Sequence, residues 1–294
     1  MNSDLAVSSW SWHAPYYAGE WSLLDQPAAA AALGISAIEC NDFMLPPPRF
    51  SRIRRPLLSL LPGAPPELWR YSRATLRGLR DRAEEKGTAV LAWTINSDFT
   101  VPAPHWPAQW LYLRRGLAAA RLLQAPLLRV NLGGAPETPA GRDPLVIRRL
   151  ASFVARSQRH YLGVTITVEN HWGLSTDVDR HLRIVDAVAG RLDPELGRRF
   201  GCCFDPGNVP DSADRPRWWR ELANRANHYH LKTVVPGTAG EEDHLPHTDL
   251  FSLLDEVGYR GKVTIEFAGD GDPAEGVRRS AQLSYIQTER EVSE

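Results

Sequence analysis

Short apolar runs alternate with longer amphipathic stretches along most of the 294-residue chain. The runs are rich in β-branched and aliphatic side chains and end in polar residues, which is typical of strands covered on both faces. The stretches between them carry apolar positions at helical spacing, often with Pro near the start and Gly just past the end. The pattern therefore predicts strands and helices in strict alternation.

Eight strand-then-helix units follow from this pattern. The strands are expected at Leu5–Trp10, Ile35–Cys40, Thr88–Ile95, Leu127–Leu132, Val164–Val168, Phe200–Phe204, His228–Leu231 and Lys262–Phe267. Strict alternation argues for parallel strands with right-handed crossovers, and eight strands are the number that closes a barrel. We therefore predict an α/β fold, a (β/α)8 TIM barrel that forms a single domain over residues 1–294, with a frayed tail after about residue 287.

The helices are expected between these strands. They are predicted from Gln26 to Gly34, Glu67 to Lys86, Pro107 to Gln124, Pro144 to Tyr161, Thr176 to Ala189, Pro216 to Ala226 and Asp249 to Val257, with a last helix from about Pro273. A long irregular loop, from about Asn41 to Pro66, contains three consecutive prolines. Loops of that length are more often lids or binding loops than inert connections.

Polar side chains end the last four strands. Glu169 and Asp205 directly follow their strands, whereas His230 and Glu266 lie near the ends of theirs. Because the carboxyl ends of barrel strands meet at one mouth, these side chains should converge. Three carboxylates and an imidazole are best accommodated there by a cation, and this donor set suits Mn²⁺, Mg²⁺, Co²⁺ or Zn²⁺. The alternative is four separately solvated residues, but four in register at the same face favour one divalent metal ion.

Composition narrows the classes of partner. With a formal net charge of -1, the chain lacks the basic surface of a phosphate-backbone binder, so no nucleic-acid partner is expected. Its three cysteines form neither a disulfide framework nor a zinc-finger spacing. No signal-peptide pattern opens the chain, and no apolar run approaches about 18 residues, so no membrane partner is expected. We expect a cytoplasmic protein that acts on a small molecule; whether it forms a homo-oligomer stays open.

The strand ends also resemble those of a known family. The runs Val168–Gly173, Phe204–Asn208, His228–Lys232 and Thr264–Phe267 look like the signature strand ends of the xylose isomerase-like TIM-barrel superfamily, which includes the sugar phosphate isomerase/epimerase family. The resemblance extends from about Leu5 to Ala274. It is specific for the fold and the metal, and much less so for the substrate.

The resemblance implies roles for four residues. In the superfamily, the residues that match Glu169, Asp205, His230 and Glu266 hold one divalent metal ion, and the two Glu exchange a proton with the carbon next to a carbonyl. Glu169 and Glu266 would then be the catalytic residues of a metal-dependent isomerase or epimerase of a sugar or polyhydroxy carbonyl compound. The chemistry agrees, because a metal ion can stabilise the enediolate while a ligating carboxylate uses its other oxygen as a base.

Further polar residues near strand ends are predicted to bind the substrate: His13, Glu39, Asn96, Asn131, His171, Asn208 and Lys232. His13 would either bond a substrate hydroxyl or cap the barrel mouth, and Glu39 would either bind substrate or pair with Arg129. Four tryptophans near the same ends would either stack on a sugar-like ring or fill the mouth. They are Trp10, Trp12, Trp93 and Trp172.

The chain departs from the family pattern at two places. Many ketose epimerases have a His where Asn208 stands, so one contact to a substrate hydroxyl is altered, and a metal ligand of the DNA-repair branch is missing. Lys232-Thr233 replaces a Lys-Asp pair, and Lys232 would either neutralise an oxyanion or pair with Glu266.

Two other functions remain open at this point. One is a metal-dependent lyase or hydrolase of a sugar-like metabolite, for example one that eliminates a glycoside through the same enediolate. The long proline-containing loop motivates it, as does the departure at Lys232-Thr233, which is expected to reshape the loop after the seventh strand. The other is a non-catalytic sugar-binding barrel that keeps the metal.

Overall fold

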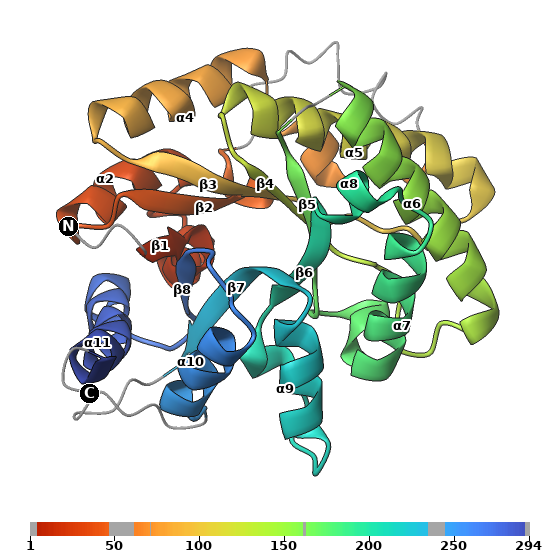
Figure 1. Cartoon of the computed structure of the whole chain (residues 1–294). Helices are drawn as coiled ribbons and strands as arrows, with labels where there is room; N and C mark the ends of the chain where they lie inside the picture. The colour runs from red at the N-terminus through yellow and green to blue at the C-terminus, as the bar shows by residue number, and fades with distance from the viewer. Residues whose placement is uncertain (1–4, 47–61, 71, 161–162, 235–244, 292–294) are drawn as a thin grey trace.

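The computed structural model describes residues 5–46, 62–70, 72–160, 163–234 and 245–291, and its strands close into a barrel (Figure 1). The strands are β1 (Leu5–Ser8), β2 (Ala37–Asn41), β3 (Ala89–Thr94), β4 (Leu127–Val130), β5 (Thr165–Glu169), β6 (Phe200–Phe204), β7 (Ala226–Thr233) and β8 (Val263–Phe267). Every strand pairs in parallel with the next. The red β1 lies beside the blue β8, and their parallel pairing closes the sheet. The predicted (β/α)8 TIM barrel is confirmed.

Helices lie outside the ring of strands (Figure 1). The longer ones are α2 (Gln26–Ala32), α4 (Arg73–Glu85), α5 (Trp106–Leu122), α6 (Asp143–His160), α7 (Val178–Ala189), α9 (Arg215–Ala223), α10 (His247–Glu256) and α11 (Pro273–Glu291), and the short ones α1 (His13–Tyr17) and α8 (Pro194–Gly197). Their apolar faces and the outward strand residues form one buried cluster. Among the described residues, no helix combines the length and the apolar character needed to cross a lipid bilayer.

The main differences from prediction lie at element boundaries. The helix expected from Glu67 begins only at Arg73, because the Ser72 side chain accepts a hydrogen bond from the Thr75 amide and caps it there. Residues Pro66–Trp69 form a separate 3-10 turn. Helix α11 ends at Glu291, and residues 47–61 of the long loop lie outside the described residues.

The interior of the barrel is polar beneath its carboxyl mouth. Side chains alternate along each strand, so the apolar Ile166 and Val168 of β5 face the helices while Glu169 faces inward. Glu39 on β2 reaches His228 on β7 with 2.5 Å between Oε2 and Nε2. These strands are not neighbours in the sheet, so the contact crosses the interior. At this level of the interior, charged side chains take the place of the aliphatic residues usual in such barrels.

Candidate functional site

Four side chains from consecutive strands meet at the carboxyl end of the barrel. Glu169, Asp205, His230 and Glu266 are all buried, and one candidate ligand atom from each lies within 4.8 Å of the others. They come from the ends of β5, β6 and β8 and from within β7. The predicted convergence of these residues is therefore observed, and they form a cluster that could hold a metal ion.

The centre of this cluster fits a cation. The Nδ1 atom of His230 lies 3.4 Å from Glu169 Oε1, 3.5 Å from Asp205 Oδ2 and 3.4 Å from Glu266 Oε2. Within the described part of the chain, neither His230 Nδ1 nor Asp205 Oδ2 has a hydrogen-bond partner. Ligands about 2.0–2.2 Å from a shared ion lie roughly 3.0–3.5 Å from one another. The spacing is therefore that of donor atoms around one ion.

The balance of buried charge points to a dication. Four carboxylates and two cationic side chains surround the cluster: Glu39, Glu169, Asp205 and Glu266, with Arg129 and Lys232. With the His230 ring neutral, as in a metal ligand, the four negative and two positive charges of these described residues leave a net charge of -2, which one divalent ion would cancel. Uncompensated buried charge is costly. Burial alone would lower the pKa of His230, yet Cys203, Glu39 and Glu266 raise it well above its ordinary value, so without a metal ion a proton on this ring offsets part of the negative charge.

Lys232 compensates two of the acids. Its Nζ lies 2.5 Å from Glu266 Oε1 and 3.6 Å from Asp205 Oδ2. Burial alone would raise the pKa of each carboxyl group, but Lys232 and His230 together more than offset it, and both pKa values are lowered. In turn, burial would lower the pKa of Lys232, and the two carboxylates raise it instead. All three groups are therefore charged near neutral pH.

A pocket of about 400 Å³ opens beside the cluster. Its polar wall includes Arg129, Glu169, Glu266 and Lys232, together with His171. Burial and the nearby Arg129 lower the pKa of His171 to about 4, so this ring is neutral at physiological pH.

The rim of the pocket is aromatic. It carries Trp10, Tyr17, Phe43 and Trp172. The Trp10 ring lies 6.3 Å from both Tyr17 and Phe43, edge-to-face, and Tyr17 is 68% exposed. An apolar wall faces polar groups, an arrangement suited to a ligand with both characters.

The residues predicted to bind substrate divide into two groups. Asn96, His171 and Lys232 line the pocket. Among the described residues, His13, Glu39, Asn131 and Asn208 do not belong to the lining of this pocket. His13 stacks on Trp10 and its Nδ1 contacts the Trp10 carbonyl at 3.0 Å, and Asn131 donates to Asn96 Oδ1 at 3.3 Å.

Glu39 makes the ion pair that was the alternative to substrate binding. Its Oε1 lies 3.3 Å from Arg129 Nε, and the carboxylate is fully buried. Lys232 likewise pairs with Glu266.

Sequence reasoning did not give site roles to Arg129 and His228. Arg129 contacts Glu169 Oε2 through Nη1 as well as pairing with Glu39. The available signals were an arginine inside the apolar β4 and a histidine two residues before His230, which places it on the same face of β7.

The closed parallel barrel, with its acidic and imidazole cluster at the carboxyl mouth, places the chain in the class of TIM-barrel proteins. The family model described as "Xylose isomerase-like TIM barrel" matches residues 27–287. The chain belongs to this family.

Several of the proteins to which this chain is similar are named for activities on sugars or glycosides. The "C-glycoside deglycosidase alpha subunit" of Microbacterium trichothecenolyticum is 28% identical over 204 residues, which cover 67% of this chain and 44% of that protein. The chain thus spans less than half the length of this relative.

Solved structures with the same fold include two epimerases. L-ribulose 3-epimerase superposes with a TM-score of 0.69 at 15% identity, covering 98% of this chain and 97% of the other. The 3-keto-D-glucoside 4-epimerase YcjR from E. coli gives a TM-score of 0.65 at 14% identity, covering 98% of this chain and 100% of the other. At such identities the likeness establishes the fold alone.

Proposed function

We propose that this protein is a divalent-metal-dependent isomerase or epimerase of a sugar or polyhydroxy carbonyl compound. The observation that carries the proposal is the placement of three carboxylate oxygens 3.4–3.5 Å from His230 Nδ1, next to a pocket. Glu169, Asp205, His230 and Glu266 would hold one Mn²⁺, Mg²⁺, Co²⁺ or Zn²⁺ ion. When bound, such an ion would polarise the substrate carbonyl and stabilise the negative charge that develops on its oxygen.

Glu169 and Glu266 are the proposed proton carriers. Each turns one oxygen to His230 Nδ1 and the other to a cation, Arg129 for Glu169 and Lys232 for Glu266. Both glutamates line the pocket, so a substrate carbon can approach either one. The cations hold the carboxylates in fixed orientations, which favours proton transfer at short range.

The reaction is a proton transfer at the carbon next to the carbonyl. One glutamate takes the proton, and the electron pair of the broken C–H bond moves into a carbon–carbon double bond as the carbonyl oxygen gains charge. The other glutamate, which must first take up a proton from solvent, returns that proton, and the first glutamate later releases its own to solvent. Return to the same carbon from the opposite face gives an epimer. Return to the former carbonyl carbon gives an isomer, provided that the hydroxyl proton of the first carbon passes to the former carbonyl oxygen.

Proton exchange with solvent tests this function. The metal-loaded protein is incubated in deuterium oxide with L-ribulose, D-psicose or a 3-keto-D-glucoside, the compounds named in its structural relatives. We expect deuterium at the carbon beside the carbonyl, detected by NMR. Glu169→Gln and Glu266→Gln should each slow turnover by about 10²–10⁴-fold. Turnover without any deuterium uptake would refute the proton-transfer mechanism, and binding without turnover of any compound would favour the sugar-binding barrel.

A second candidate is a lyase that removes the aglycone of a glycoside. The observation that favours it is the name of the 28% identical relative, a C-glycoside deglycosidase subunit. One of the two glutamates, Glu169 or Glu266, would take a proton from the carbon next to a ring carbonyl. A new carbon–carbon double bond would form as the bond to the aglycone breaks. The aglycone would leave with a proton from the other glutamate. Product mass separates the two candidates, because an isomerase conserves the mass of its substrate and a lyase yields two smaller products.

A further inference from the structure

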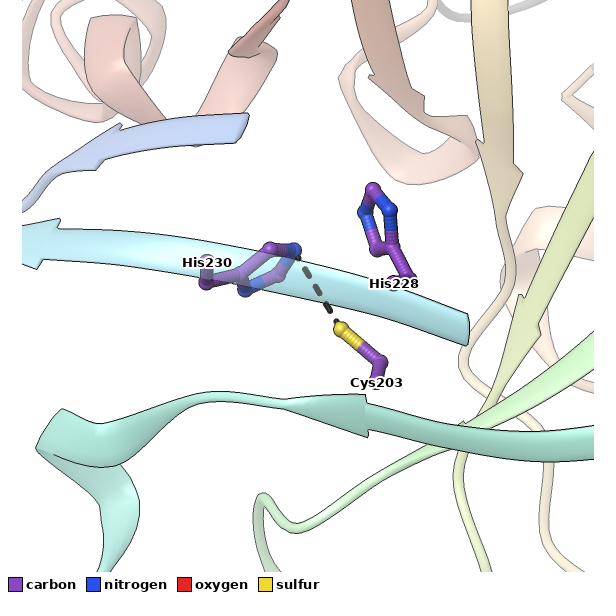
Figure 2. A group of neighbouring side chains, drawn as sticks. All are labelled: Cys203, His228 and His230. Carbon is purple, nitrogen blue, oxygen red and sulfur yellow. Dashed lines mark hydrogen bonds between the residues drawn. The ribbon is translucent and has the colours of Figure 1, made fainter. Parts of the chain in front are cut away.

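A buried carboxylate lies directly beneath the four-residue cluster. Glu39 Oε2 is 2.5 Å from His228 Nε2 and 3.0 Å from His230 Nε2, and the side chain is fully buried. Figure 2 shows the two imidazoles on β7, with Cys203 reaching from the adjacent β6 toward His230. Glu39 thus contacts the Nε2 atom of His230, whereas the Nδ1 atom of the same ring faces the cluster.

The contact with Glu39 determines which nitrogen of His230 carries the proton. A carboxylate can only accept hydrogen bonds, so a nitrogen 3.0 Å from Oε2 must be the N–H donor. In the neutral ring, Nδ1 is then unprotonated and presents its lone pair to Glu169, Asp205 and Glu266. A lone pair aimed at three carboxylates is unfavourable unless a cation accepts all four donors, and a neutral imidazole is the form that binds a metal ion.

Cys203 does not alter this assignment. Its Sγ lies 3.5 Å from His230 Nε2 (Figure 2), which is longer than the contact to Glu39. A thiol sulfur is also a weaker acceptor than a carboxylate oxygen. The Nε2 atoms of both histidines are therefore hydrogen-bonded to Glu39.

The other oxygen of Glu39 reaches a second member of the cluster. Oε1 lies 3.3 Å from Arg129 Nε and accepts a hydrogen bond from Thr94 Oγ1 at 3.2 Å. Arg129 also contacts Glu169 through Nη1, and its Nη2 donates to Asn41 Oδ1 at 3.0 Å. Because the guanidinium group is planar and rigid, the position of Glu39 constrains that of Glu169.

We propose that Glu39 is a positioning residue that orients His230 as a metal ligand through Nδ1 and, by way of Arg129, holds Glu169 in place. The inference rests on the proposed function, since it assigns Glu39 a role toward the metal ion. A purely structural ion pair with Arg129 would leave metal affinity unchanged. The proposal instead couples one side chain that does not line the pocket to the affinity of the site.

Metal affinity of matched variants tests the coupling. Glu39→Gln keeps the shape of the side chain but replaces one acceptor oxygen with a donor. Loss of such an outer partner typically weakens metal binding by about 10–100-fold, and we expect that loss by calorimetric titration with Mn²⁺. Asp42→Asn is the control, because Asp42 is equally buried but bonds the Tyr112 hydroxyl at 2.6 Å. Equal affinity of Glu39→Gln and the unchanged protein, or an equal loss in Asp42→Asn, would overturn the proposal.

A second measurement follows the protonation of His230 in the unchanged protein. Nitrogen-15 NMR of the Zn²⁺-loaded protein reports the protonation of each histidine nitrogen, with the His230 signals assigned by their loss in His230→Asn. The expected pattern is a proton on Nε2 and none on Nδ1, and the reverse pattern would refute the orientation. If the unchanged protein binds no divalent ion, the proposed function fails as a whole. If it binds one and Glu39→Gln binds as tightly, only the role of Glu39 fails.

Discussion

Removal of the Lys232 ammonium should strongly destabilise the metal-free protein. In Lys232→Met the buried cluster loses one positive charge, and Glu266 and Asp205 lose the cation that lies 2.5 and 3.6 Å from them. Breaking a buried ion pair costs about 3–5 kcal/mol. Because the Lys232 side chain keeps 15% of its surface exposed, we expect the lower value, about 3 kcal/mol. For a domain of this size, that corresponds to a fall in Tm of about 6–12 °C.

The divalent ion should reverse part of this loss. The variant has one more uncompensated negative charge at the site, so Mn²⁺ should raise its Tm by more than it raises that of the unchanged protein. Both shifts are measured by differential scanning calorimetry with chelator and with saturating metal. Lys86→Met is the matched control, since Lys86 pairs with Glu85 at the surface and exposed pairs contribute only about 0–1 kcal/mol. The reasoning is refuted if Lys232→Met costs no more than Lys86→Met, or if metal stabilises it less than the unchanged protein.

Three further predictions follow from the site and the core. Trp10→Ala should raise KM by about 3- to 10-fold with little change in kcat, because one aromatic contact contributes about 0.5–1.5 kcal/mol; an unchanged KM in steady-state kinetics would exclude Trp10 from binding. Arg129→Lys should lower the free energy of unfolding by about 1.5–3 kcal/mol, because an ammonium group cannot bridge both carboxylates, and urea unfolding identical to that of the unchanged protein would contradict this. Burial, reinforced by Arg225, lowers the pKa of His181 to about 4. The unfolded chain therefore binds the extra proton first, and about 3 kcal/mol of stability should be lost as pH falls from about 6.5 to 4. His181→Gln should lack that part of the pH dependence, and an identical dependence in both proteins would refute the assignment.

The sequence was most informative where a local pattern decides the structure. Strand β6 has the predicted bounds, Phe200–Phe204, because an apolar run between polar residues fits a strand covered on both faces. The convergence of Glu169, Asp205, His230 and Glu266 was also predictable, since barrel closure brings all strand ends to one mouth. In contrast, the start of α4 depends on one hydrogen bond to the Ser72 side chain, which the helical spacing of apolar residues does not reveal.

Contacts across the barrel could not be predicted in detail. Glu39 meets His228 and His230 from a strand that is not adjacent to theirs. Such contacts depend on the stagger of all eight strands around the barrel, whereas strand periodicity gives only the face to which a side chain points. The sequence therefore offered substrate binding and an ion pair with Arg129 as alternatives for Glu39, and only the structure revealed its contacts with the two histidines.

Titration of the chelator-treated protein with Mn²⁺ tests the central claim most directly. We predict one ion per chain, with affinity reduced by more than about 100-fold in Asp205→Asn, beyond the loss typical of an outer-shell partner. Asp211→Asn should bind Mn²⁺ like the unchanged protein, because the Asp211 side chain is 93% exposed and pairs with Arg215 at the surface. No binding, or binding that Asp205→Asn leaves intact, would contradict the account.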